Sequence, residues 1–268
     1  MLAPWLELTK PRIGVFVVFA AFVGGLLASG PKPDFLHVAW AAVLVGMVAG
    51  SSCVFNHIIE RDLDRKMERT AQRPLVTGRI GVRDAVFFGS ALALIGTIGL
   101  GLVYGMLSAL LGLGTLIAYA LVYTPLKRHT SLNTVVGAIP GAMPPLLGYV
   151  AISGEMGPWA FMLFGILFAW QFPHFFAIAW LYREDYRRAG MMMLPAMPNS
   201  EGAAGQQSLL YGLVLLPVSM MPFWHGEAGL FYAVVSAVAG VVYVGASFAF
   251  ARRENRKTAR RLMLVSLV

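Results

Sequence analysis

Charged residues are scarce in this chain. Only 13% of its 268 residues are Asp, Glu, Lys or Arg, whereas a soluble domain carries about 25%. Apolar residues make up 58% of the chain, and its mean hydropathy is +0.70. So few charges, together with long apolar runs, exclude an ordinary soluble protein and predict an integral membrane protein.

Cysteine is almost absent as well. The single cysteine, Cys53, lies inside an apolar run, which excludes an internal disulfide and a metal site built on cysteines. The N-terminal region shows neither the layout of a cleavable signal peptide nor an Arg/Ser-rich transit peptide. These absences favour a bacterial inner membrane over an organelle into which the protein is imported.

Eight apolar stretches are long enough to cross a bilayer, since a spanning helix needs about 20 residues. They cover residues 13–30, 35–58, 85–104, 106–126, 131–152, 157–182, 208–225 and 228–251. The uncharged stretch 85–126 is too long for one span, and we divide it near Tyr104 and Gly105. The apolar segment 262–268 is too short to cross, which indicates either a truncated chain or an incomplete ninth helix. We predict an all-α, polytopic membrane bundle, because the strands of a membrane β-barrel would alternate apolar and polar residues.

The distribution of basic residues predicts the orientation. If the N-terminus is cytoplasmic, 20 of the 21 Lys and Arg residues lie on the cytoplasmic side and only Lys32 lies on the other. Such a bias is typical of inner-membrane proteins. Topology and contact with anionic lipid therefore account for the net charge of +8, and we expect no nucleic-acid partner.

A dense group of charges follows the second span, in the sequence NHIIERDLDRKMERT at 56–70. Asn56, Glu60 and Asp64 are spaced four residues apart, so on a continuing helix they share one face. A row of oxygen ligands at a membrane boundary predicts a Mg²⁺ site, because Mg²⁺ prefers carboxylates and often holds substrate phosphates as well. The alternative is a solvated helix end whose acids pair with the neighbouring bases.

A second acid, Asp185, ends the sixth span and is a candidate for a second metal ligand. The alternative for Asp185 is an ion pair at the end of a helix. Basic residues surround both acids, and such residues suit the oxygens of a diphosphate, although each could instead serve only as a topology signal. The candidate diphosphate ligands are Arg65, Arg69, Lys127, Arg128 and Arg183.

Prolines interrupt the fifth and sixth spans, at positions 140, 144, 145 and 173. Interrupted backbone is tolerated in a membrane where it is buried in protein or lines a cavity, so we expect these spans to border an internal cavity. His174 lies beside Pro173 within the sixth span, and intramembrane polar groups usually face the bundle interior. His174 could ligate a heme iron or handle a proton, or it could form a structural hydrogen bond with backbone freed by Pro173.

Five ordered motifs of the chain resemble the UbiA intramembrane prenyltransferases, and within them the heme-farnesylating branch. They are LTKPRI at 8–13, NHIIERDLDRKMERTAQRPL at 56–75, YTPLKRHTSLNTVVGAIPGAMPPLLGY at 123–149, WQFPHFFAIAW at 170–180 and DYRRAGMMMLP at 185–195. The resemblance implies one domain over 1–268, with nine helices around a central cavity. It also implies Mg²⁺ as cofactor, with farnesyl diphosphate and heme B as substrates.

The resemblance further implies transfer of the farnesyl group to a vinyl group of heme B, which forms heme O. Asn56, Glu60, Asp64 and Asp185 would then be the catalytic metal ligands, and His174 would position the heme. A heme A-forming enzyme or a terminal oxidase would be the downstream partner. Two other functions remain open, prenylation of an aromatic or quinone precursor and transport of an anion.

The chain departs from the family pattern at two positions. Glu60 stands where the first family signature commonly has Asp, and Glu supplies the same carboxylate on a longer side chain. Ala189 stands four residues after Asp185, where the general family repeats an aspartate. The second departure weakens the expectation of two equivalent metal sites.

Overall fold

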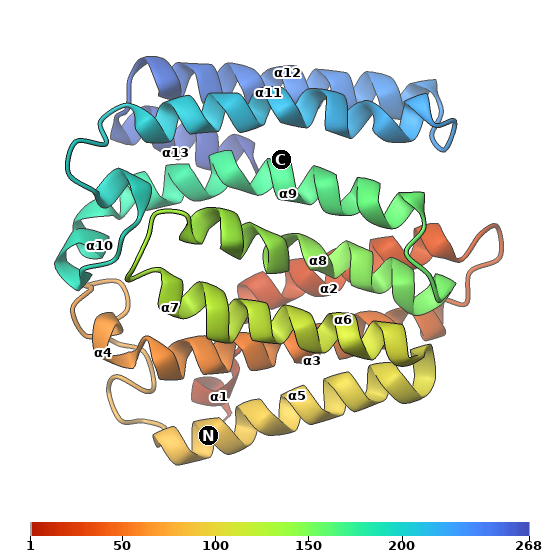
Figure 1. The fold of residues 1–268 in the computed structure, drawn as a ribbon, viewed down its shortest axis with the longest axis horizontal. Coiled ribbons are helices and arrows are strands. Elements are labelled where there is room, and N and C mark those ends of the chain that lie inside the picture. The colour runs from red at the N-terminus through yellow and green to blue at the C-terminus, as the bar shows by residue number, and fades with distance from the viewer. Residues whose placement is uncertain (1, 268) are drawn as a thin grey trace. The chain divides into compact units, whose positions relative to one another are not determined.

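The computed structural model describes residues 2–267, and every regular element within them is a helix (Figure 1). The helices are α1 (Ala3–Leu8), α2 (Pro11–Ala28), α3 (Phe35–Ile59), α4 (Arg61–Asp64), α5 (Val82–Tyr104), α6 (Met106–Ile117), the π-helix η1 (Ala118–Tyr123), α7 (Thr124–Leu126), α8 (Asn133–Ser153), α9 (Pro158–Leu181), α10 (Arg183–Ala189), the 3-10 helix η2 (Leu194–Ala196), α11 (Ala203–Trp224), α12 (Leu230–Arg252) and α13 (Arg256–Val265). The predicted all-α class is confirmed.

Eight helical segments of residues 2–267 are long and apolar enough to span a membrane, which confirms the predicted number of full spans. The fourth span runs continuously through α6, η1 and α7, over Met106–Leu126. The predicted break at Gly105 is also present, because this residue has φ = 91° and ends α5. α13 has 10 residues and is too short to span a membrane.

Two helix starts differ by three residues or more from the sequence-based boundaries. α5 begins at Val82 rather than at residue 85, and α11 begins at Ala203 rather than at residue 208. In both cases the helix includes polar residues, such as Arg83 and Gln206, that precede the apolar run. Backbone hydrogen bonds continue through these residues whatever their side chains are, so apolar length marks the membrane core rather than the end of the helix.

The chain forms two compact units. One comprises residues 1–126 and 139–164, and the other comprises residues 127–138 and 165–268, so α8 and α9 contribute to both. Met1 and Val268, the last residue of the short apolar segment 262–268, lie outside the described residues. A single domain over the whole chain stays a prediction.

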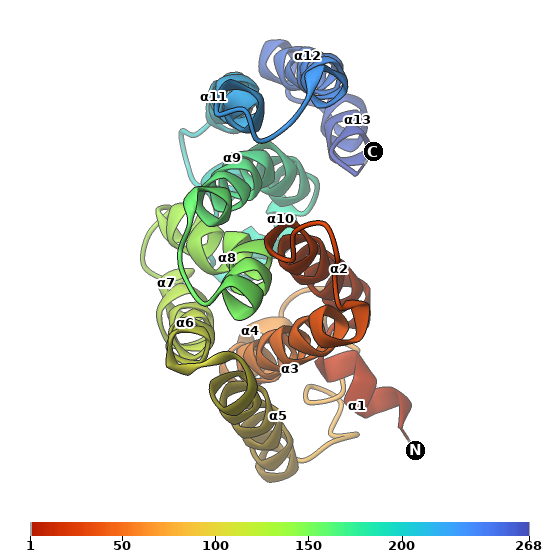
Figure 2. The same cartoon turned by 90° about the vertical axis from the view of Figure 1, so that its right-hand side faces the viewer.

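In the first unit, α3 lies between α2 and α5 (Figure 2). Small residues allow α2 to pack closely on α8 (Asn133–Ser153) as well. Gly24 of α2 lies against the Pro145 carbonyl of α8, and Gly148 of α8 lies against the Ala21 carbonyl of α2, so a methyl group at either glycine would collide with backbone. On the other side of α3, the Ser51 hydroxyl donates a hydrogen bond to the Gly89 carbonyl of α5 at 2.8 Å.

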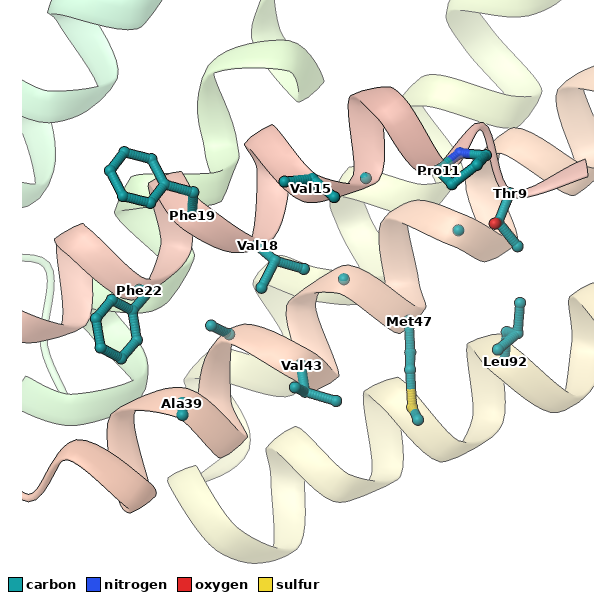
Figure 3. A pocket seen from close by; sticks show the side chains of 14 residues that line it. Thr9, Pro11, Val15, Val18, Phe19, Phe22, Ala39, Val43, Met47 and Leu92 are labelled. Atoms are coloured by element: carbon teal, nitrogen blue, oxygen red, sulfur yellow. The ribbon is translucent and has the colours of Figure 1, made fainter. Parts of the chain in front are cut away.

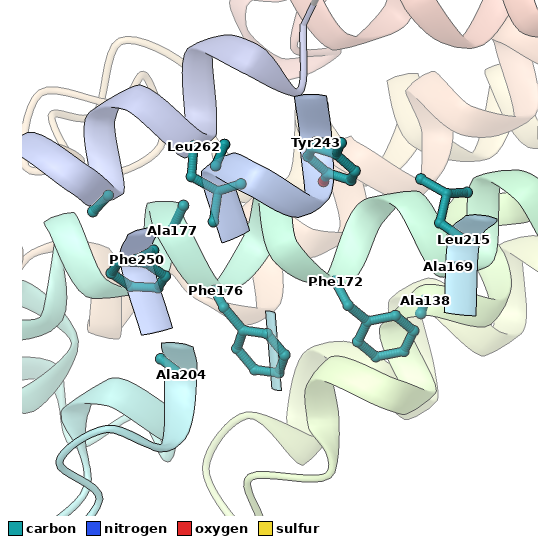
Figure 4. Close-up of a cluster of buried hydrophobic side chains, with 12 residues drawn as sticks. Ala138, Ala169, Phe172, Phe176, Ala177, Ala204, Leu215, Tyr243, Phe250 and Leu262 are labelled. Atoms are coloured by element: carbon teal, nitrogen blue, oxygen red, sulfur yellow. The ribbon is translucent and has the colours of Figure 1, made fainter. Parts of the chain in front are cut away.

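The second unit contains a core formed by α9, α11, α12 and α13. Phe172 of α9, Phe250 of α12 and Leu262 of α13 are completely buried in it (Figure 4). The Tyr243 hydroxyl of α12 donates a hydrogen bond to the Trp170 carbonyl of α9 at 2.7 Å. These contacts hold α12 and α13 in one core with α9, the helix that carries His174.

Candidate active site

The predicted acid row lies where α3 passes into α4. The Glu60 amide donates to the Asn56 carbonyl at 2.9 Å, and the Asp64 amide donates to the Glu60 carbonyl at 2.8 Å. Helical hydrogen bonding therefore continues through the junction, and the three side chains keep a spacing that places them along one face. All three residues are buried. Carboxylates that are merely solvated at a helix end are exposed, so the burial of Glu60 and Asp64 is unusual.

Asn56 joins three segments of the first unit. The Lys10 ammonium donates to Asn56 Oδ1 at 2.7 Å, and Asn56 Nδ2 donates to Thr124 Oγ1 at 3.1 Å. Thr124 in turn donates to the Tyr119 carbonyl, within the π-helix η1, at 2.9 Å. Asn56 Oδ1 already accepts one hydrogen bond and has a second lone pair, so its role as a metal ligand stays a prediction.

Lys10 has an unusual backbone conformation. Its φ is 52° and its ψ is 63°, in the left-handed region, which is uncommon for a residue other than glycine and costs free energy. Lys10 precedes Pro11, the first residue of α2, and its ammonium reaches Asn56 on α3. Strain that is retained beside a buried polar cluster points to a role for this side chain in the site.

One carboxylate oxygen of Asp64 accepts a hydrogen bond, and the other does not. Arg73 Nη1 donates to Oδ2 at 2.6 Å, whereas the buried Oδ1 has no hydrogen-bond partner among residues 2–267. Burial raises the pKa of the Asp64 carboxyl above its ordinary value; Arg73 opposes this shift, and the charge of Glu60 adds to it. An orphaned buried oxygen of this kind calls for a ligand.

Glu60 and Asp64 fit a Mg²⁺ ion that is completed by substrate. No group of three or more His, Cys, Asp or Glu side chains in the described part of the chain is arranged to hold a metal alone. Mg²⁺ is usually bound through one or two carboxylates, with waters and substrate phosphates supplying the remaining ligands. The orphaned Oδ1 of Asp64, next to a second buried carboxylate, meets this requirement.

Two bases of this unit were missed as site residues by the sequence reasoning. Arg73 binds Asp64 directly, whereas the predicted Arg65 lies 4.0 Å from Asp62 in an exposed pair, and the predicted Arg69 is exposed. Lys10, the other missed base, is 46 residues from its partner Asn56. Both residues lie within the quoted motifs, but neither has a periodic spacing to the acids that would have identified its contact.

In the second unit, Asp185 is buried in α10 and its Oδ1 accepts a hydrogen bond from Arg188. This pair is the helix-end alternative considered for Asp185, and a role in metal binding stays a prediction. Arg183 stacks on the ring of Trp180, with its Cζ 4.0 Å from the ring centroid, and donates to the Trp180 carbonyl at 2.9 Å. Its guanidinium is thus partly engaged before any diphosphate binds.

The loop that carries Lys127 and Arg128 is tied to the segment after α10. The Met192 amide donates to the Lys127 carbonyl at 2.7 Å, and the buried Asn133 side chain donates to the Met192 carbonyl at 2.8 Å. Arg128 is exposed. The backbone of Lys127 is therefore tied to the segment after α10 within the second unit.

His174 contacts Ser266, the residue that follows α13, rather than backbone freed by Pro173. Its Nδ1 lies 2.6 Å from the Ser266 hydroxyl, and its ring stacks on Trp170, with centroids 5.2 Å apart. Trp170 Nε1 donates to the Ser266 carbonyl at 2.9 Å. These contacts use one nitrogen of the imidazole, and the proposed role of His174 toward heme would need the other.

An apolar groove of about 620 Å³ runs along α2 and α3 (Figure 3). Val15, Phe19 and Val43 contribute to its lining, and Leu92 of α5 closes one end. None of Asn56, Glu60 and Asp64 lines it, and neither does any residue of α8 or α9. The predicted cavity bordered by α8 and α9 is therefore a different feature and stays a prediction.

Comparison with known proteins identifies the family. The sequence pattern of the UbiA prenyltransferase family matches residues 17–268. The chain belongs to the UbiA prenyltransferase family. This membership makes the protein a prenyltransferase and confirms the family expected from the five motifs, and we set the transport alternative aside.

Individual UbiA relatives agree with this assignment. The chain is 38% identical over 273 residues to a protoheme IX farnesyltransferase of Solibacter usitatus, covering 98% of this chain and 94% of the relative. It is also 38% identical over 278 residues to a protoheme IX farnesyltransferase of Koribacter versatilis, covering 100% of this chain and 89% of the relative.

A solved UbiA homolog from Archaeoglobus fulgidus, bound to GPP and Mg²⁺, has a similar fold. Its TM-score is 0.75 at 19% identity, and the alignment covers 99% of this chain and 96% of that chain. The protein is therefore a multi-pass membrane protein with the UbiA fold. At this identity the likeness concerns the fold and assigns no residue of the site.

Proposed function

We propose that this prenyltransferase transfers a farnesyl group from farnesyl diphosphate to a vinyl group of heme B, forming heme O. Two relatives that align over nearly the whole chain are named protoheme IX farnesyltransferase. The observation that carries the proposal is the buried pair Glu60 and Asp64, with an orphaned oxygen on Asp64. A prenyl diphosphate needs such a site for its charged leaving group.

The reaction breaks the bond between C1 of the farnesyl chain and the diphosphate oxygen, and diphosphate leaves with the electron pair. The allylic carbon then bonds to a vinyl carbon of heme B. Water adds to the other vinyl carbon and loses a proton, which gives a hydroxyethylfarnesyl side chain. The apolar environment of the spans protects the allylic cation from other water molecules.

The first unit supplies the groups for diphosphate departure. Glu60 and Asp64 would hold Mg²⁺, which neutralises negative charge on the leaving group. A homolog of the family was solved with both GPP and Mg²⁺ bound. Arg73 orients the Asp64 carboxylate through its hydrogen bond to Oδ2, so that the orphaned Oδ1 is presented to the ion.

Further cations would stabilise the developing diphosphate charge. We propose Lys10, held by Asn56, in addition to the bases predicted from the sequence. The predicted bases are Arg65, Arg69, Lys127, Arg128 and Arg183. Asp185 remains the proposed second metal ligand, and His174 the proposed heme-positioning residue.

We further propose that the protein lies in a bacterial inner membrane, with the N-terminus and the charged loops in the cytoplasm. The charge bias of the loops supports this orientation. Farnesyl diphosphate would then reach the site from the cytoplasm, with its tail in the membrane. Heme O would pass to a heme A-forming enzyme or to a terminal oxidase.

The test is a reconstituted reaction. We would incubate the purified protein in detergent with heme B, farnesyl diphosphate and Mg²⁺ and detect farnesylated heme by mass spectrometry. Asp64→Ala should lower the rate about 100-fold or more, as the loss of a charge-stabilising group does elsewhere. Asp62→Ala is the matched control, because the Asp62 side chain is 82% exposed and two residues away, and it should keep nearly full activity.

Product that requires Mg²⁺ and disappears with Asp64→Ala would support both the reaction and the site. Turnover of an aromatic acid in place of heme would overturn the proposed acceptor. An equal loss in Asp62→Ala and Asp64→Ala would overturn the assignment of Asp64, because a general effect of negative charge would then explain both results.

A further inference from the structure

The densest group of basic residues in the second unit has no part in the reaction described above. Six bases occupy ten positions where α12 passes into α13, namely Arg252, Arg253, Arg256, Lys257, Arg260 and Arg261. All six are exposed. Glu254, the one acid among them, is used elsewhere, since its Oε1 accepts a hydrogen bond from the Gly205 amide of α11 at 2.5 Å. We refer to residues 252–261 as the basic segment.

The basic segment is electrostatically unfavourable in isolation. No base of this segment forms an ion pair with any residue between 2 and 267. Arg256 and Arg260 are four residues apart, as are Lys257 and Arg261, and like charges at this spacing destabilise a helix. Arg256 and Lys257 also occupy the first turn of α13, where the helix dipole disfavours positive charge.

Two features keep α13 helical despite this repulsion. Asn255 caps the helix, and its side chain accepts hydrogen bonds from the amides of Lys257 and Thr258 at 3.0 Å each. The opposite face of α13 is buried, with Leu262 inserted in the core of the unit (Figure 4). The bases are thus held on a fixed face, and an external anion would relieve their repulsion.

The shape of this surface indicates the kind of anion. Arg256, Lys257, Arg260 and Arg261 line a shallow pocket of about 540 Å³ together with Leu264 and Val265. Leu264 is 50% exposed and lies about 12 Å along the helix from Arg256. A ligand for this pocket therefore carries negative charge at one end and hydrocarbon at the other.

We propose that the basic segment and α13 bind an anionic phospholipid, with its phosphate among the four bases and its acyl chain along Leu264. Clusters of bases directly beside a spanning helix are suited to anionic headgroups, and each base near such a membrane surface adds to the attraction. α12 is a spanning helix that ends at Arg252, so the segment lies at the required depth.

The carboxylates of heme B are the competing ligand, and the geometry of α13 disfavours them. His174, the proposed heme-positioning residue, contacts Ser266. Ser266 caps the C-terminus of α13 and continues its buried face, which Ala259 and Leu262 form. At 100° per residue this face is opposite to the four bases. A heme held at His174 would not meet the basic pocket.

A bound lipid would affect the site through the same helix. Ser266, the residue that caps the C-terminus of α13, contacts both His174 and Trp170. An anion that reduces repulsion in the first half of α13 stabilises the helix that positions these two side chains. We therefore expect anionic lipid to stabilise the protein and to raise its activity.

The test compares phosphatidylglycerol with zwitterionic phosphatidylcholine, added to the full chain in detergent, with the midpoint of thermal unfolding as readout. Phosphatidylglycerol should raise the midpoint by a few degrees more than phosphatidylcholine does, as a ligand of the native state must. High salt should reduce this difference. The double variant Arg260→Gln, Arg261→Gln should lose it, and Gln is a good helix former that should leave α13 folded.

Two matched variants make the result decisive. Lys32→Gln with Arg83→Gln removes the same net charge elsewhere and should keep the response to phosphatidylglycerol, and Arg260→Lys with Arg261→Lys should keep most of it. A response that survives in the Arg260, Arg261 glutamine variant would overturn the proposal, as would an equal loss in the Lys32, Arg83 variant. Heme absorbance measures heme binding by the Arg260, Arg261 glutamine variant. Weaker heme binding with an unchanged response to phosphatidylglycerol would overturn the proposal and assign the bases to heme instead.

Discussion

Asp64 is subject to opposing requirements. Its burial raises the pKa of the carboxyl, so ionisation costs free energy in the folded protein without metal. Metal binding, however, requires the ionised form. Arg73 moderates this conflict by a hydrogen bond at 2.6 Å to one oxygen, while the other oxygen remains available to a ligand.

A stability measurement should reveal this conflict. Because the folded pKa of Asp64 lies above the unfolded value, the parent loses stability as the pH rises through the folded pKa. Asp64→Asn removes the charge but keeps an oxygen for Arg73, so the variant should unfold at a higher temperature than the parent at pH 7 without Mg²⁺. The measurement is thermal unfolding in detergent at pH 7 and at acidic pH, where the advantage should shrink.

Asp62→Asn is the control for this experiment, because the exposed Asp62 side chain should change the midpoint little. A parent that is more stable than Asp64→Asn at pH 7 without metal would show that the pair with Arg73 outweighs the cost of burial. That result would contradict the prediction that ionised Asp64 destabilises the folded protein without metal.

The sequence predicted some contacts of the candidate site and not others, for a physical reason. The common face of Asn56, Glu60 and Asp64 was predictable because helical periodicity is visible in one short segment, and their role as metal ligands stays a prediction. Arg73 and Lys10 reach them only because a loop folds back and because a strained residue redirects the chain at the start of α2. Neither event leaves a periodic pattern in the sequence.

Among the helices of the first unit, α2 and α8 make a close backbone contact. Gly148 and Gly24 each face a backbone carbonyl of the other helix with no space for a methyl group. Backbone cannot move aside as a flexible side chain can, so the two helices would have to separate to accept even an alanine. Interfaces of small residues are how membrane helices approach closely.

Gly148→Ala should therefore destabilise the protein by about 1–3 kcal/mol, the usual cost of overpacking. Gly114→Ala in α6 is the matched control, because a methyl group there would meet no atom within 4 Å. This control should be neutral or stabilising by up to about 1 kcal/mol. Thermal unfolding of both variants in the same detergent measures the difference, and equal midpoints would contradict the contact.

The number of spanning helices was predictable because it depends mainly on apolar length. The prolines of α8 and α9 predicted a cavity, but they gave no sign that both helices would remain continuous over 21 and 24 residues. Close contacts such as that of Gly148 with Ala21 join residues more than 100 positions apart, and no local pattern in the sequence specifies them.

For the whole molecule, the bias of 20 bases to one side predicts the orientation in the membrane. Single cysteines test it, and the only native cysteine, Cys53, is buried and can be replaced by alanine. In that background, a membrane-impermeant thiol reagent applied to intact cells should label Lys32→Cys. Lys66→Cys should be labelled only after the inner membrane is opened, and the reverse pattern would overturn the orientation.

The Asn56 amide also bears on how the protein is made. Its two partners lie 46 residues before it and 68 residues after it. A ribosome that adds about 5–20 residues per second needs roughly 3–14 s to reach Thr124 once Asn56 has emerged. During this interval the end of α3 enters the membrane with half of its hydrogen-bonding network missing, so water or the insertion machinery must satisfy the amide until the fourth span arrives. The proposed diphosphate site is therefore completed only when the fourth span is made, after α3, the helix that leads into Glu60 and Asp64, has been inserted.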